Sequence, residues 1–146
     1  MKVERTIEID ASRERVWEKL MDPRCLGDWV SIHKSLKEAP DGELRRGSEL
    51  TQCLTLAGTS FNVHWKVEEA DAPRHAVWDG KGPMRSKASV VYDLEDAGGG
   101  KTIFHYMNEF KSPGGPFGGI IDRVTGGTAE RAADKTLGNL KSLLES

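Results

Sequence analysis

Apolar and polar residues alternate along much of the chain, as expected for β-strands that bury one face. The first alternating stretch covers positions 2–9, and others follow between about 34 and 110, where no helical stripe occurs. Turn residues such as Asp41-Gly42 and Gly98-Gly99-Gly100 separate these stretches. Because the connections are short, we expect an antiparallel meander with one apolar, aromatic face and one charged face.

Helical patterns flank the meander at both ends. After Asp10 or Ser12, either of which can cap a helix, an apolar stripe that includes Trp17 runs until Pro23 interrupts it. A second short helix or turn is expected over residues 25–29. These short helices follow directly on the first strand, so the chain is predicted to fold as strand, short helices and then meander.

The C-terminal segment, roughly 117 to 145, is predicted to be a long helix that covers the apolar face of the sheet. Gly126-Gly127 lies inside it and lowers its helix propensity. The two glycines are explained equally well by a kink or close packing and by empty volume left beneath the helix. The expected inward residues are Ile121, Val124, Thr125, Thr128, Ala132, Leu137, Leu140 and Leu144.

Composition limits the classes of partner. The chain has 146 residues, the usual size of one domain, and we expect a single domain over 1–146. Its net charge of -2, from 21 basic and 23 acidic residues, gives no reason to expect nucleic acid or an anionic membrane surface as partner. No apolar run reaches transmembrane length. Cys25 and Cys53 lie far apart and no signal peptide is evident, so we expect reduced thiols and a cytoplasmic location.

Three stretches carry a resemblance to a known family. They are "IEIDASRERVWEKLMDPRCLGDW" at 7–29, "FKSPGGPFGG" at 110–119 and "TLGNLKSLLES" at 136–146. In this order and spacing the chain resembles the START-like, or SRPBCC, superfamily, and within it the polyketide cyclase/dehydrase and lipid-transport type. The resemblance covers essentially the whole chain and implies an α+β helix-grip fold. In that fold a curved antiparallel sheet wraps around a long C-terminal helix, with two short helices after the first strand.

The resemblance also implies a cavity between sheet and helix that takes an apolar ligand. Large aromatic residues dominate core burial in any case, so those on the apolar face are explained either by a filled core or by a ligand pocket. A polar side chain on that face, such as Gln52 or Asn108, needs a partner, and a ligand or a trapped water is a natural one. The candidate ligand-binding residues are Trp29, His33, Gln52, Trp65, Trp78, Ser86, Tyr106, Asn108, Phe117, Ile121, Thr125 and Thr128.

Three functions compete. The leading one is the binding, and possibly the transport, of a small apolar or amphipathic ligand such as a lipid, quinone or polyketide, by a monomer or weak homodimer. The alternative is an aromatase/cyclase-like enzyme acting on a polyketide-type substrate, with Tyr106 and His33 as candidate acid/base residues. A third is a scaffold that acts through a protein partner. Family cyclases are thought to use cavity arginines, yet every arginine that can be placed here falls outside the inward face, with Arg85 the least certain.

No metal or cofactor is expected. None of the four histidines lies in an HxH, HxxxH or HExxH motif, and His64, His105 and Asp79 fall on the outward register of their strands. The loop at 110–119 lacks the sequence of a phosphate-binding loop. Its glycines and prolines suit either a rigid corner or a gate over the cavity with Phe117 as an apolar plug.

Overall fold

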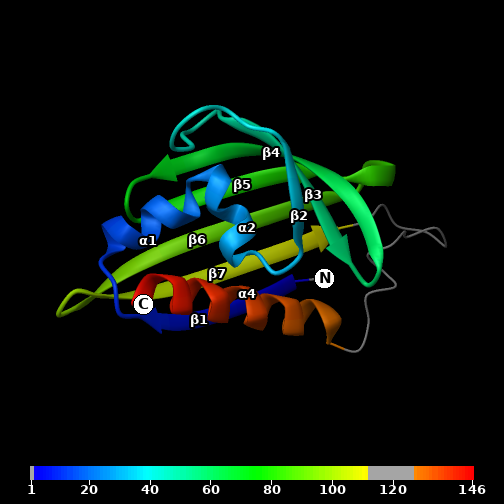
Figure 1. Ribbon diagram of the computed structural model, residues 1–146. Coiled ribbons are helices and arrows are strands. Elements are labelled where there is room, and N and C mark those ends of the chain that lie inside the picture. The colour runs from blue at the N-terminus through cyan, green and yellow to red at the C-terminus, as the bar shows by residue number, and fades with distance from the viewer. Residues whose placement is uncertain (1, 112–126) are drawn as a thin grey trace.

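The computed structural model describes residues 2–111 and 127–146. Figure 1 shows one curved sheet with helices on its concave side. The elements in chain order are β1 (Lys2–Ile9), α1 (Arg13–Leu20), the 3₁₀ turn η1 (Pro23–Cys25), α2 (Leu26–Trp29), β2 (His33–Glu38), β3 (Glu49–Leu56), β4 (Thr59–Asp71), β5 (His75–Lys81), the 3₁₀ turn η2 (Pro83–Arg85), β6 (Lys87–Gly98), β7 (Lys101–Lys111) and α4 (Thr128–Glu145).

The sheet has seven strands in the order β1-β7-β6-β5-β4-β3-β2, and every pairing is antiparallel. Strands β2 to β7 follow one another as the predicted meander. The first strand does not pair with its neighbour in sequence but adds to the far edge, where Val3 lies opposite Asn108 of β7. The α+β helix-grip prediction is confirmed.

Local signals set the bounds of the first helices. Of the two candidate caps, Ser12 is the one used: its hydroxyl accepts a hydrogen bond from the backbone N–H of Arg15, at 3.3 Å. Asp22 then caps the following 3₁₀ turn by accepting from the backbone N–H of Arg24, at 3.0 Å. Pro23 occupies the first position of that turn, where its missing N–H costs nothing.

Helices α2 and α4 meet over the concave face of the sheet (Figure 1). The backbone N–H of Ser31, just after α2, donates to Thr136 Oγ1 at 3.0 Å, and the Ser31 hydroxyl donates to the carbonyl of Ala132 at 2.9 Å. On its other side α4 is tied to β1, where Arg5 Nε and Asp134 Oδ1 lie 2.8 Å apart. The apolar stripe of α4 that these contacts hold against the core contains Ala133, Leu137, Leu140 and Leu144.

The predicted helix through Gly127 is wrong at that residue. Gly127 is the N-cap of α4, and its φ of 79° lies in the left-handed region that glycine adopts without strain. The glycine therefore precedes α4 rather than lying in its interior. The predictions for Phe117, Ile121, Val124, Thr125, Gly126 and the gate loop beyond residue 111 lie outside the described residues.

The outer face of the sheet carries an ion-paired histidine. His75 on β5 lies between two carboxylates, with Nδ1 at 2.5 Å from Asp93 Oδ1 on β6 and Nε2 at 2.9 Å from Glu69 Oε2 on β4. Hydrogen bonding to Asp93 and then to Glu69 raises the pKa of His75 above its usual 6.5. The charged imidazolium thus links three neighbouring strands.

This link predicts a pH-dependent contribution to stability. Because the folded pKa is raised, the contribution is complete below pH 6.5 and is lost as the pH rises through the folded pKa. We expect the difference in unfolding free energy between wild type and His75→Gln, measured by urea titration, to shrink as the pH rises through that range. A difference that stays constant with pH would contradict the prediction.

Candidate functional site

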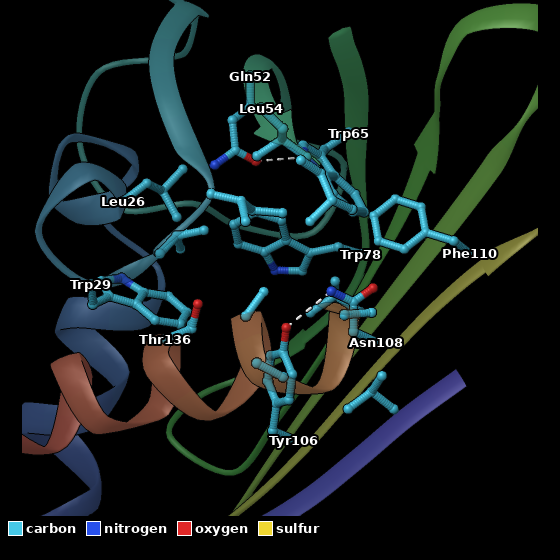
Figure 2. A pocket seen from close by; sticks show the side chains of 18 of the residues that line it. Leu26, Trp29, Gln52, Leu54, Trp65, Trp78, Tyr106, Asn108, Phe110 and Thr136 are labelled. Atoms are coloured by element: carbon cyan, nitrogen blue, oxygen red, sulfur yellow. Dashed lines mark hydrogen bonds between the residues drawn. The ribbon is translucent and has the colours of Figure 1, made fainter. Parts of the chain in front are cut away.

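A cavity lies between the concave face of the sheet and helices α2 and α4, with a volume of about 70 Å³. Figure 2 shows aromatic side chains from the sheet on one side and Trp29 and Thr136 from the helical layer on the other. No charged side chain is among the described residues that line it. Those residues are Val3, Leu26, Trp29, Val30, Ile32, Gln52, Leu54, Leu56, Trp65, Trp78, Val90, Tyr92, Tyr106, Asn108, Phe110, Ala129, Ala132, Ala133 and Thr136.

The aromatic wall follows from strand alternation. Trp65, Trp78, Tyr92 and Tyr106 come from the four consecutive strands β4 to β7, and their rings pack in sequence. The centroids of Trp65 and Trp78 are 5.9 Å apart in an edge-to-face arrangement, the geometry that aromatic quadrupoles favour. Gly80 lies directly opposite Trp65 in the ladder, and the absence of a side chain there leaves room for the indole.

A hydrogen-bond chain fixes one end of this wall. Trp65 Nε1 donates to Gln52 Oε1 at 3.0 Å, and Gln52 Nε2 lies 2.9 Å from His33 Nδ1. An indole nitrogen can only donate, so Gln52 must turn its amide nitrogen toward His33, whose Nδ1 must then accept. The chain therefore requires neutral His33 with its proton on Nε2. Burial lowers the pKa of His33 below 6.5, in agreement with this state.

The other polar group of the cavity joins Asn108 to Tyr106. Asn108 Nδ2 donates to the Tyr106 hydroxyl at 3.0 Å, as Figure 2 shows. The hydroxyl proton remains available to the cavity. Burial raises the pKa of Tyr106, so this proton is retained at neutral pH, while the hydrogen bond from Asn108 acts in the opposite direction.

Buried polar atoms without a partner gather at this cavity. Among the described residues four such side-chain atoms occur: Trp17 Nε1, Trp29 Nε1, Trp78 Nε1 and Asn108 Oδ1. All but the Trp17 nitrogen belong to residues that line the cavity. Buried polar groups are normally hydrogen-bonded. The atoms that lack such a partner are therefore concentrated at residues that line the cavity.

Six of the predicted ligand-binding residues line the cavity: Trp29, Gln52, Trp65, Trp78, Tyr106 and Asn108. Ser86 is not among the lining residues, because its hydroxyl turns back to donate to the carbonyl of Pro83 at 2.7 Å. Thr128 is not among them either, since the lining on α4 begins at Ala129. His33 stands behind Gln52 rather than at the cavity surface.

The predicted ligand-binding residues do not include the whole lining. Val90 and Tyr92 share the alternation that includes Ser86, so their inward direction was readable from the pattern. Val3 was not, because its place depends on the pairing of β1 with β7, more than 90 residues away in the chain. Ala132, predicted to face inward from the C-terminal helix, also lines the cavity. The other lining residues outside the predicted set are Leu26, Val30, Ile32, Leu54, Leu56, Phe110, Ala129, Ala133 and Thr136.

Elsewhere the outward predictions are confirmed. His64, His105 and Asp79 are exposed, as is Arg85, and none of them lines the cavity.

No group of histidine, cysteine, aspartate or glutamate within residues 2–111 and 127–146 could hold a metal ion. Cys25 and Cys53 are both free thiols. In the same ranges no helix is long and apolar enough to cross a membrane.

Comparison with known proteins gives the family. The sequence profile described as polyketide cyclase / dehydrase and lipid transport matches residues 1–145. The chain belongs to this family.

Individual relatives are distant. A Mycobacterium tuberculosis protein described only as uncharacterized is 22% identical over 131 residues, which cover 89% of this chain and 92% of that protein. The Zhui aromatase/cyclase from a Streptomyces species superposes with a TM-score of 0.78 at 17% identity and covers 99% of this chain and 93% of its own. The Aha1 dimer from Colwellia psychrerythraea gives 0.63 at 19% identity, with 99% and 96% covered. At such identities the two structures establish a common fold.

Gly80 gives a direct test of the aromatic wall. A Cβ atom there would lie 2.7 Å from the ring of Trp65 and 2.8 Å from Val63, so Gly80→Ala must displace a bulky side chain. We expect a loss of about 1–3 kcal/mol in unfolding free energy. The control is Gly138→Ala on α4, where nothing lies within 4 Å of the new atom and a gain of up to about 1 kcal/mol is expected. Urea unfolding that ranks the two variants equally would contradict this account.

The hydrogen-bond chain predicts coupled titration of His33 and Trp65. Because the folded pKa of His33 is lowered, its neutral form stabilises the fold above pH 6.5, and this contribution is lost as the pH falls through the folded pKa. Protonation of His33 Nδ1 places an N–H opposite the amide nitrogen of Gln52, so the hydrogen bond between the two side chains is lost. We expect the Trp65 indole resonance to shift with the midpoint of His33 in NMR titrations, while the Trp17 indole stays unchanged. If the Trp65 resonance does not follow the titration of His33, the hydrogen bonds that link His33, Gln52 and Trp65 do not exist in solution.

Proposed function

We propose that the protein binds a small, uncharged apolar or amphipathic ligand in the cavity beneath α4. The observation that carries this proposal is the gathering of unpaired polar atoms, Trp29 Nε1, Trp78 Nε1 and Asn108 Oδ1, in an otherwise apolar and aromatic lining. A mostly apolar pocket with a few convergent polar groups is the usual form of a small-molecule site. A ligand that meets these atoms would offset the cost of burying them.

The volume limits the ligand. Pockets that enclose a drug-sized molecule measure roughly 300–1,000 Å³, whereas this cavity measures about 70 Å³. A compact ligand, or one end of a larger one, fits with small movements of the lining. A complete polyketide or lipid requires larger displacement of the side chains between the sheet and α4.

The aromatase/cyclase alternative is supported by one feature, the Tyr106 hydroxyl. Its proton is available to the cavity and could polarise a substrate carbonyl. Cyclisation and dehydration also need a proton acceptor, and the described lining contains no carboxylate, histidine or lysine. His33 is engaged through Nδ1 with Gln52, so its role as a base is not favoured. Binding without chemistry is therefore the function we prefer.

The location that we propose is the cytoplasm. The free thiols of Cys25 and Cys53 fit a reducing compartment of this kind.

A cavity-filling variant tests the proposal. Ala133 is 6% exposed and lines the cavity from α4, so the larger side chain of Ala133→Leu fills part of the cavity that a ligand would occupy. The control, Ser142→Leu, adds a leucine to an exposed position of the same helix. Native mass spectrometry of protein from its producing host is expected to detect a bound compound on wild type and on Ser142→Leu, with strong loss on Ala133→Leu.

Thermal unfolding completes this test. Compounds extracted from the wild type should raise its melting temperature on re-addition, because a ligand that binds the folded state stabilises it. The same compounds should leave folded Ala133→Leu unaffected. If neither co-purified nor added apolar compounds stabilise the wild type, the ligand-binding proposal is wrong.

A further inference from the structure

We propose that Asn108, Tyr106 and Trp78 form a subsite for an uncharged hydroxyl group on a ring, as in a phenol or alicyclic alcohol, and that the cavity rejects carboxylates. This inference rests on the proposed ligand-binding function and adds the chemical class of the ligand. It follows from strand register, from the donors and acceptors left open, and from the charge of the lining.

Strand register places Trp78 and Asn108 in one row across the sheet, with Val90 between them, and Tyr106 in the neighbouring row. Trp78 on β5 lies opposite Val90 on β6, and Val90 lies opposite Asn108 on β7, so the three form one row across the sheet. With about 4.8 Å between neighbouring strands, the backbones at the ends of this row are roughly 10 Å apart. Val90 has the shortest side chain of the row and lines the cavity together with Trp78 and Asn108. In Figure 2 the Trp78 indole is drawn between Gln52 and Tyr106, and the Asn108 amide points toward the Tyr106 hydroxyl.

The Asn108–Tyr106 pair offers one donor and one acceptor. Asn108 Nδ2 donates to the tyrosine oxygen, so the tyrosine O–H and Asn108 Oδ1 remain for a ligand. Reversing the amide exchanges these roles but again leaves one donor and one acceptor. A hydroxyl group both donates and accepts, and it matches this pair. Trp78 Nε1, also without a partner, supplies a second donor to the ligand oxygen.

Charge excludes an anionic ligand. No lysine, arginine or histidine is among the described residues of the lining. Burial raises the pKa of both Tyr92 and Tyr106, so the two phenols are neutral. A carboxylate would lose its hydration without gaining a cation. The ring of the ligand would lie among Trp65, Trp78 and Phe110.

Three probes of similar ring size test the inference: phenol, toluene and benzoate. They are titrated at millimolar concentration against protein labelled with ¹⁵N, and the indole N–H resonances are followed. Phenol is expected to shift the Trp78 resonance, while the Trp17 resonance, whose nitrogen is also buried and unpaired but lies outside the cavity, stays in place. Benzoate is expected to shift neither.

Two variants separate the subsite from the cavity. Asn108→Leu keeps the approximate shape but removes the polar pair, so phenol should bind about tenfold more weakly, whereas toluene should bind within about twofold of wild type or more tightly. Tyr106→Phe removes the hydroxyl and should weaken phenol in the same direction, with melting temperatures confirming that both variants are folded.

The outcomes distinguish the two proposals. If toluene binds wild type but phenol shows no dependence on Asn108 or Tyr106, the hydroxyl subsite is wrong and the apolar cavity stands. If benzoate binds as well as phenol, the charge argument is wrong. If no probe shifts the Trp78 resonance, the subsite is overturned, and if extracted or added apolar compounds also fail to stabilise the protein, ligand binding is overturned with it.

Discussion

The fold depends on covering one strongly curved apolar face. Seven antiparallel strands bring apolar side chains, aromatic ones on β4 to β7, to the concave side, and this side must be removed from water. A single helix covers about 10 Å of width, so α4 alone cannot close a sheet of this size. The helical layer is completed by α1 and α2, and the cavity lies where α2, α4 and the sheet meet.

Polar contacts hold the cover in one position. The Ser31 contacts fix the middle of α4 next to the cavity, and at its C-terminal end Arg15 donates to the carbonyl of Leu144 at 3.2 Å. The backbone N–H of Asp10 donates to Glu145 Oε2 at 2.9 Å. These contacts lie near the two ends of the segment that contains Leu137, Leu140 and Leu144. The smaller residues Ala129, Ala132 and Ala133 line the cavity that remains between α4 and the sheet.

Alternation and turn residues were sufficient to predict the sheet, the short helices and the inward direction of Trp65, Trp78 and Tyr106. Alternation states which face a residue takes, but not what lies next to it. It therefore predicts Ser86 in the cavity, although the Ser86 hydroxyl donates to the carbonyl of Pro83 in the adjacent 3₁₀ turn. Helix propensity predicts Gly127 inside the helix because it does not reveal a left-handed cap. The unpaired atoms of Trp78 and Asn108 depend on three-dimensional neighbours, and no sequence pattern encodes them.

Two neighbouring tryptophans of the cavity wall differ in their hydrogen bonding. The indole nitrogen of Trp65 is paired with Gln52, which is linked in turn to His33. Trp78 has an equivalent nitrogen and no partner, beside an amide with a free oxygen. Burial raises the pKa of Tyr106, so its hydroxyl keeps its proton at neutral pH. The described lining residues thus combine satisfied and open polar groups with no ionised side chain, and the proposed binding of a neutral ligand rests on this combination.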